Sequence, residues 1–130
     1  MSDYAVKRID DMDAALFGGF KRARAELGVE SFGMQVIDLP PSFDRYPNHD
    51  HTHDDQEEVF LALRGSGELE VDGERMPLDQ DHMARVGPAA KRKVWPGPDG
   101  VRLLILGGVP GRAYSAPEVS EIGGPEPKMP

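Results

Sequence analysis

Several residue types that carry common chemistries are missing from this chain of 130 residues. It contains no cysteine, which excludes disulfides, thiolate catalysis and zinc sites built on thiolates. No apolar run approaches the roughly 18–20 residues that a membrane-spanning helix needs, so we expect no membrane span. The first residues lack a basic patch followed by an apolar stretch, so we expect no secretory signal and a cytoplasmic protein.

Positive charge is also scarce. The chain has 15 Lys and Arg residues against 23 Asp and Glu residues, a formal net charge of −8. Such a surface repels nucleic acids and anionic membranes on average, so we expect neither as a partner. The basic run Lys91-Arg92-Lys93 is too short to reverse this. The other cluster, Lys21, Arg22 and Arg24, is interpreted as the solvated face of a helix.

Glycine and proline, by contrast, are abundant. The 15 Gly and 12 Pro residues form about a fifth of the chain, against roughly 12% in average proteins. This excess disfavours a helical bundle and favours short strands joined by tight turns. The length suits one domain, in which we expect an N-terminal arm with a short helix (1–30), a β-barrel (31–109) and an extended Pro/Gly-rich tail (110–130).

The apolar pattern supports this mainly β interpretation. Apolar residues recur at helical spacing from Ala14 to Leu27, with Gly28 as the stop, and the helix begins either at Ala14 or after Gly18-Gly19. Asp72-Gly73 predicts a tight hairpin, and the cluster 96–100 predicts a turn. About seven short strands, which suit a small β-sandwich or barrel, are expected at 32–37, 58–64, 68–71, 75–78, 82–86, 92–95 and 101–106.

The loop before the second of these strands is rich in histidine. His49, His51 and His53 are spaced two residues apart, and in an extended segment such residues point to one face. Glu58 follows at the start of an apolar strand, where a hairpin could bring its carboxylate to the imidazoles. Imidazoles with a carboxylate suit divalent Fe, Mn, Ni, Zn or Cu, among which the sequence does not choose.

Alternation along the strand 58–64 places Glu58, Phe60 and Ala62 on one face. Phe60 is therefore a candidate contact for a bound small molecule, as is Gln56 in the loop. The acidic residues around them are interpreted as surface charges that favour cation entry: Asp54, Asp55 and Glu57.

The segment His51-x-His53-x4-Glu58-x6-Gly65 resembles the first motif of the cupin superfamily in residue type and spacing. The resemblance extends from about Phe32 to Leu106 and implies a jelly-roll β-barrel with a metal site inside. Transferred residue by residue, it makes His51, His53 and Glu58 the metal ligands. A competing register uses His49 and His51, with Gln56 or Glu58 completing the set.

The second cupin motif does not match, and its histidine ligand corresponds to Arg92. A guanidinium cannot coordinate a metal, which leaves three interpretations. Arg92 binds an anionic substrate beside the metal, or it pairs with Glu58 and replaces the metal, or it points outward with Lys91 and Lys93. His82, near the start of the strand 82–86, is not expected to be a ligand.

The resemblance leaves the function open between different classes. The first interpretation is a metal-binding cupin that acts on a small anionic metabolite by oxygenation, isomerisation or decarboxylation. The second is a non-catalytic small-molecule-binding or sensing cupin without a functional metal, and the third is a scaffold. Barrels of this family commonly pair, so we expect a homodimer.

Overall fold

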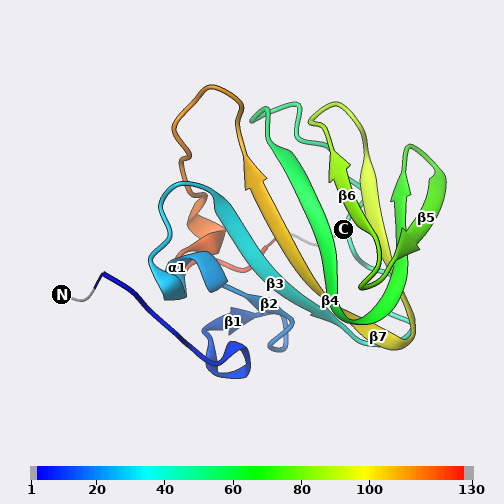
Figure 1. Ribbon diagram of the computed structural model, residues 1–130, viewed down its shortest axis with the longest axis horizontal. Helices are drawn as coiled ribbons and strands as arrows, with labels where there is room; N and C mark the ends of the chain where they lie inside the picture. Colours follow the sequence, from blue (N-terminus) through cyan, green and yellow to red (C-terminus); the bar gives the residue numbers. More distant parts are fainter. Residues whose placement is uncertain (1–2, 128–130) are drawn as a thin grey trace.

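The computed structural model describes residues 3–127. Within them the chain forms one antiparallel sheet of seven strands in the order β1-β2-β3-β7-β4-β5, with β6 paired to β4 (Figure 1). The mainly β architecture is as predicted. The strands are β1 (Ala14–Ala15), β2 (Phe20–Lys21), β3 (Gly33–Leu39), β4 (Glu57–Val71), β5 (Glu74–Leu78), β6 (Met83–Val86) and β7 (Arg92–Gly108).

The two longest strands, β4 and β7, run side by side through the middle of the sheet (Figure 1). The sequence predicted each of them as two strands, and it predicted a turn at 96–100. Instead, Gly65 pairs with Val101 and Gly67 pairs with Pro96, so residues 97–100 of β7 face Ser66 alone. The glycines and prolines therefore make a bulge that bends a continuous strand rather than ending it.

The predicted hairpin at Asp72-Gly73 is present. Asp72 and Gly73 join β4 to β5 with φ angles of 49° and 87°. A tight two-residue hairpin turn favours positive φ at both of its central residues. β3 ends at Leu39, immediately before Pro40-Pro41, because proline cannot donate a hydrogen bond to the ladder.

Of the two predicted helix starts, the structure shows the later one, after Gly18-Gly19, and it shows the predicted end at Gly28. The α-helix α1 spans Ala23–Leu27, and Gly28 ends it in the left-handed conformation with φ of 76°. Residues 14–21 instead form the hairpin β1–β2, because the Gly18-Gly19 pair favours a turn over a helix. Two single-turn 3-10 helices, η1 (Ile9–Asp11) and η2 (Glu118–Ser120), complete the described elements. Within residues 3–127, no helix has the length and apolar character to cross a membrane.

The basic residues of the α1 region are buried rather than solvated, which corrects the sequence interpretation. Lys21, Arg22 and Arg24 are 7%, 3% and 6% exposed. The Arg22 guanidinium donates to the backbone carbonyls of Val119, Gly124 and Pro125, and Arg24 pairs with Glu121 at 2.8 Å. These arginines hold the C-terminal segment against α1, because the segment's carbonyls have no strand partner to accept from.

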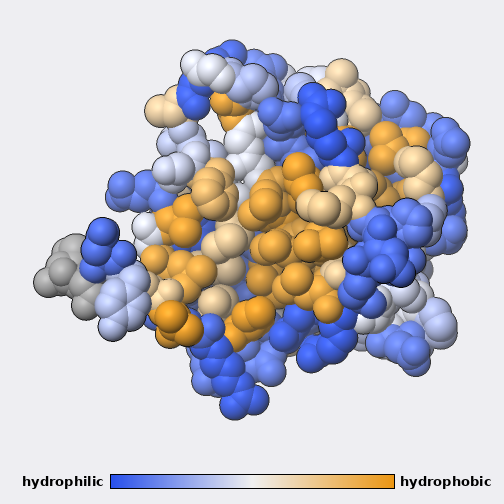
Figure 2. Space-filling view, viewed as in Figure 1, coloured by the Kyte–Doolittle hydropathy of each residue, from blue (hydrophilic) through white to orange (hydrophobic). Residues whose placement is uncertain are grey.

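The sheet curls around one main apolar core and carries further apolar side chains, most of them half-buried, on its other face. Phe60, Ala62, Leu103 and Ile105 lie inside, together with residues from β5, β6 and the N-terminal half of β7. Figure 2 shows apolar side chains gathered over β3, β7 and β4 on the opposite face. We call this the outer apolar face; cross-strand neighbours on it are Val59, Leu61, Leu104, Leu106 and Met83.

Candidate metal centre

A cavity of about 1000 Å³ opens inside the curled sheet. Its apolar wall includes Ile37, Phe43 and Ile105, and its polar wall includes His49, His51, Gln56 and Glu58. Glu58 reaches this cavity because it shares the inward face of β4 with Phe60 and Ala62, as alternation predicted.

Space beside Glu58 comes from two glycines. Glu58 pairs with Gly107 of β7, and Gly107 pairs with Gly33 of β3. A methyl group at Gly107 would lie 2.7 Å from Gln56 Oε1, and one at Gly33 would lie 2.8 Å from the Tyr114 hydroxyl. Gln56, from the loop before β4, and Tyr114, from the C-terminal segment, therefore pack directly against the sheet at these two glycines.

Backbone hydrogen bonds fix the histidine loop against the start of β7. His49 and Arg92 exchange both backbone bonds, at 3.1 and 2.8 Å, and the His51 amide donates to the Pro88 carbonyl at 2.9 Å. The chain then turns, with the amides of Asp54 and Asp55 donating to the His51 carbonyl. His49 and His51 therefore keep the extended alternation that points both side chains inward, but the segment after His51 does not.

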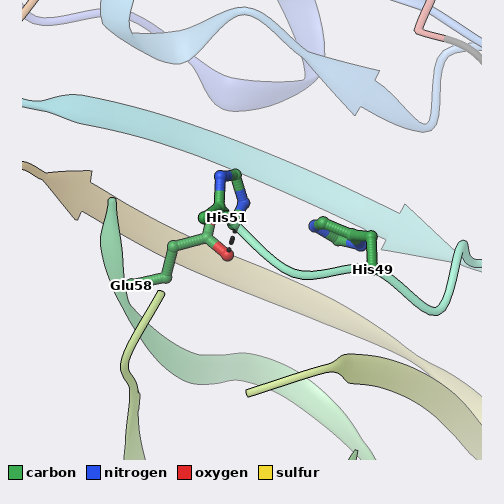
Figure 3. A group of neighbouring side chains, drawn as sticks. All are labelled: His49, His51 and Glu58. Atoms are coloured by element: carbon green, nitrogen blue, oxygen red, sulfur yellow. Dashed lines mark ion pairs between the residues drawn. The ribbon is translucent and has the colours of Figure 1, made fainter. Parts of the chain in front are cut away.

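His49, His51 and Glu58 converge at the cavity wall (Figure 3). Each offers one ligand atom, and these three atoms lie within 4.8 Å of one another. His51 Nε2 lies 3.3 Å from Glu58 Oε1. Because a neutral imidazole would direct a lone pair at the carboxylate there, a proton or a cation is needed between the two atoms.

Hydrogen bonds set the same orientation for both imidazoles. His49 Nδ1 lies 2.8 Å from the Pro47 carbonyl and His51 Nδ1 lies 3.0 Å from Asp54 Oδ1. Both partners are acceptors, so each ring donates from Nδ1 and turns Nε2 toward the site. His51 Nε2 is buried and, among residues 3–127, has no hydrogen-bond partner. Two imidazole nitrogens and a carboxylate are ligands that suit a divalent transition metal. His51 Nε2, which has no hydrogen-bond partner among the described residues, is free to coordinate one.

The surroundings favour an ionised Glu58, whereas burial and neighbouring charges act in opposite directions on the pKa values of the histidines. Burial raises the pKa of Glu58, but His51 and Arg92 outweigh it and hold this pKa below its usual value. Burial lowers the pKa of His49. At His51 burial also acts to lower the pKa, yet Glu58 and Asp54 together raise it above the ordinary value. The surroundings therefore favour a proton on His51 more than on His49.

Arg92 is completely buried and pairs with Glu58. Its exposed fraction is 0%, Nη1 donates to Glu58 Oε1 at 2.7 Å, and Nη2 donates to the Gly87 carbonyl at 2.5 Å. Nε is buried without a partner among the described residues. The structure shows the contact with Glu58 and excludes the outward position, and both terminal nitrogens have protein acceptors. Replacement of a metal by this pair, and binding of an anionic substrate by Arg92, stay predictions.

The other candidates differ in burial and in whether they line the cavity. The His53 side chain is 72% exposed, and its Nε2 contacts Asp54 at 3.3 Å, so it could join a second, outer group with His51 and Asp54. Gln56 lines the cavity and donates to Asp54 Oδ2 at 2.9 Å. Phe60 is 0% exposed within the core and is not part of the cavity wall.

Three residues at the site were missed by the sequence reasoning. Asp54, interpreted as a surface charge, orients His51. Gln35 lies on the cavity wall with a buried Oε1 that has no partner among the described residues, and strand alternation with Gly33 and Ile37 could have identified it. Tyr114 lies in a segment without periodicity, so no sequence signal placed it at the cavity.

The fold is similar to that of solved proteins, although the sequence is not close to a known family. No protein-family model matches the sequence, and no curated protein matches it. A cupin protein from Bacteroides fragilis matches with a TM-score of 0.68 at 20% identity, over 90% of this chain and 93% of its own. An RmlC-like cupin protein from Desulfovibrio desulfuricans matches at 0.53 and 17% identity, over 78% and 88%. The Cnp3 cupin domain of Schizosaccharomyces pombe matches at 0.53 and 21% identity, over 61% of this chain and 56% of that one.

At these identities the likeness concerns the fold alone, and it agrees with the resemblance of the segment His51–Gly65. This chain has the fold of the cupin superfamily.

Proposed function

We propose that this protein binds one divalent transition metal through His49, His51 and Glu58, and that it holds a small molecule in the adjoining cavity. One observation carries the proposal: two imidazoles fixed by Nδ1 hydrogen bonds share a cavity wall with a carboxylate, all three ligand atoms within 4.8 Å. Three protein ligands on one side of a metal leave positions open for a substrate.

A metal in this position would supply a Lewis acid or a site for O₂. Oxygenation, isomerisation and decarboxylation of a small acid are the reaction classes that such a centre supports. The protein's own groups would orient the substrate: apolar walls such as Ile37 and Phe43 exclude water, while Gln35, Gln56 and Tyr114 offer hydrogen bonds.

The Arg92–Glu58 pair supports a second candidate function, a cupin that binds a small molecule without a metal. The buried pair is neutral as it stands, and Glu58 Oε1 already accepts from Arg92. In that case the cavity would be a binding or sensing site with no metal chemistry.

Metal content separates the two functions. The protein is purified without a histidine tag, supplied with Mn, Fe, Co, Ni, Cu or Zn in turn, passed through a desalting column and assayed by mass spectrometry. We expect one equivalent in the wild type and in His82→Ala, which removes an exposed histidine paired with Asp79. We expect its loss in His49→Ala and in His51→Ala.

His53→Ala distinguishes the two ligand registers. It should keep its metal if His49, His51 and Glu58 are the ligands, and it should lose the metal if His53 is a ligand. Failure of the wild type to retain any of the metals would favour the metal-free function.

A further inference from the structure

The candidate metal centre contains a fixed positive charge as well as a carboxylate. Arg92 is 0% exposed and the Glu58 side chain 15% exposed, and their charged groups approach to 2.7 Å. A guanidinium keeps its proton under all ordinary conditions. The negative charge that Glu58 would offer a metal is therefore already balanced by Arg92.

The titratable groups next to the three ligand residues change this balance little. His49 and His51 must be neutral to act as metal ligands. Tyr46 stays neutral because burial and the charge of Glu58 raise its pKa. Asp54 adds one negative charge on the far side of His51, where its side chain is 33% exposed and therefore partly screened by water.

A divalent metal would thus leave an excess positive charge at a buried site. The sum is +2 for the metal with the Arg92–Glu58 pair, and +1 if Asp54 is counted in full. Excess charge in a cavity with apolar walls is unfavourable unless a counter-charge enters with it. Arg92 cannot move aside easily, since its terminal nitrogens are held by Glu58 and by the Gly87 carbonyl.

We propose that the metal and a small anion, such as a carboxylate, bind to this site cooperatively, because the anion cancels the charge that Arg92 leaves uncompensated. The inference rests on the proposed metal site and names the substrate class for it. The anion occupies the cavity side of the centre. Arg92 attracts it through charge and not through a bidentate hydrogen bond, because both terminal nitrogens already donate to protein acceptors. By thermodynamic linkage, each partner raises the affinity of the other by the same factor.

The first experiment uses Co²⁺ and acetate as probes of the wild-type protein. The dissociation constant for Co²⁺ is measured by competition with a chromophoric chelator, in acetate and in perchlorate at equal ionic strength and pH. We expect acetate to tighten Co²⁺ binding by about ten-fold or more, within the usual range of coupling between sites. Acetate titrated into the Co²⁺-loaded protein should change the visible Co²⁺ spectrum.

The second experiment removes the charge of Arg92. Arg92→Met should bind Co²⁺ more tightly than the wild type in perchlorate and should gain less from acetate. Arg85→Met is the matched control, because Arg85 lies 2.7 Å from Glu57 on the opposite face of β4 and is 64% exposed. It should behave as the wild type does. If Arg92→Met does not fold, Arg92→Lys, which keeps the charge, should keep the acetate effect.

The outcomes separate this inference from the proposed function. Equal Co²⁺ affinities in acetate and perchlorate would contradict the cooperativity while leaving the metal site intact. An acetate effect of full size in Arg92→Met would contradict the role of Arg92. Absence of Co²⁺ binding in both media would contradict the metal site itself.

Discussion

Replacing Arg92 by methionine should destabilise the metal-free protein far more than the same change at Arg85. Both guanidinium groups lie 2.7 Å from a glutamate on β4, but Arg92 is 0% exposed and Arg85 is 64% exposed. At 2.7 Å and an effective dielectric constant of about 20, the gross attraction of the buried pair is about 6 kcal/mol. Relief of the desolvation of Arg92 offsets part of this, which leaves a loss of about 3–5 kcal/mol.

The exposed pair has a much smaller effect. Water screens it and its side chains lose rotamer freedom on pairing, so Arg85→Met should cost about 0.2–1 kcal/mol. Urea unfolding of both variants in EDTA measures the difference. For a domain of this size, a loss of about 3–5 kcal/mol corresponds to a fall in Tm of roughly 10–20 °C.

Two further results follow from the same reasoning. Adding Glu58→Gln to Arg92→Met removes the unpaired charge and should restore much of the stability. The defect of Arg92→Met should also shrink at acidic pH, because removal of Arg92 takes away one of the charges that hold the pKa of Glu58 down and lets the carboxylate protonate at a higher pH than in the wild type. An Arg92→Met protein as stable as Arg85→Met would refute the interpretation that Arg92 neutralises a buried carboxylate.

The remaining predictions concern the metal centre and the outer apolar face. Asp54→Ala should weaken metal binding about 10–100-fold without removing a ligand, because the His51 imidazole loses the acceptor that orients it. An unchanged affinity in a metal titration would contradict the orienting role of Asp54. Metal affinity should fall as the pH drops through the pKa of His51, because protons and metal compete for Nε2. Glu58 and Asp54 hold this pKa above its usual value despite burial. A metal affinity that does not change between pH 8 and about 6 would argue against His51 as a ligand. The outer apolar face predicts a homodimer, so light scattering of the wild type should give twice 14.3 kDa. The Met83 side chain is 69% exposed on this face, so Met83→Lys should give the monomer. A wild-type mass of 14.3 kDa at micromolar concentration would contradict the dimer.

Sequence reasoning predicted the barrel because strand alternation and turn chemistry are local signals. β3, β5 and β6 fall close to their predicted ranges. It could not predict that residues 96–100 continue β7, because a bulge depends on the pairing partner across the sheet. Nor could it predict the burial of Arg22 and Arg24, since each has an acceptor about 100 residues further along the chain.

The candidate site shows the same limit. Alternation placed His49, His51 and Glu58 together, but it also placed His53 with them. The turn that follows His51 separates His53 from the cavity, and that turn is set by backbone hydrogen bonds from Asp54 and Asp55. The His51 amide in turn donates to the Pro88 carbonyl, a contact that spacing alone does not reveal.

The metal site can be located in a crystal structure of the protein grown with Mn²⁺, in which anomalous scattering identifies the ion. We expect one anomalous peak at coordination distance from His49 Nε2, His51 Nε2 and a Glu58 carboxylate oxygen. A peak held by His51, His53 and Asp54 instead, or density for the intact Arg92–Glu58 pair with no peak beside it, would contradict this expectation.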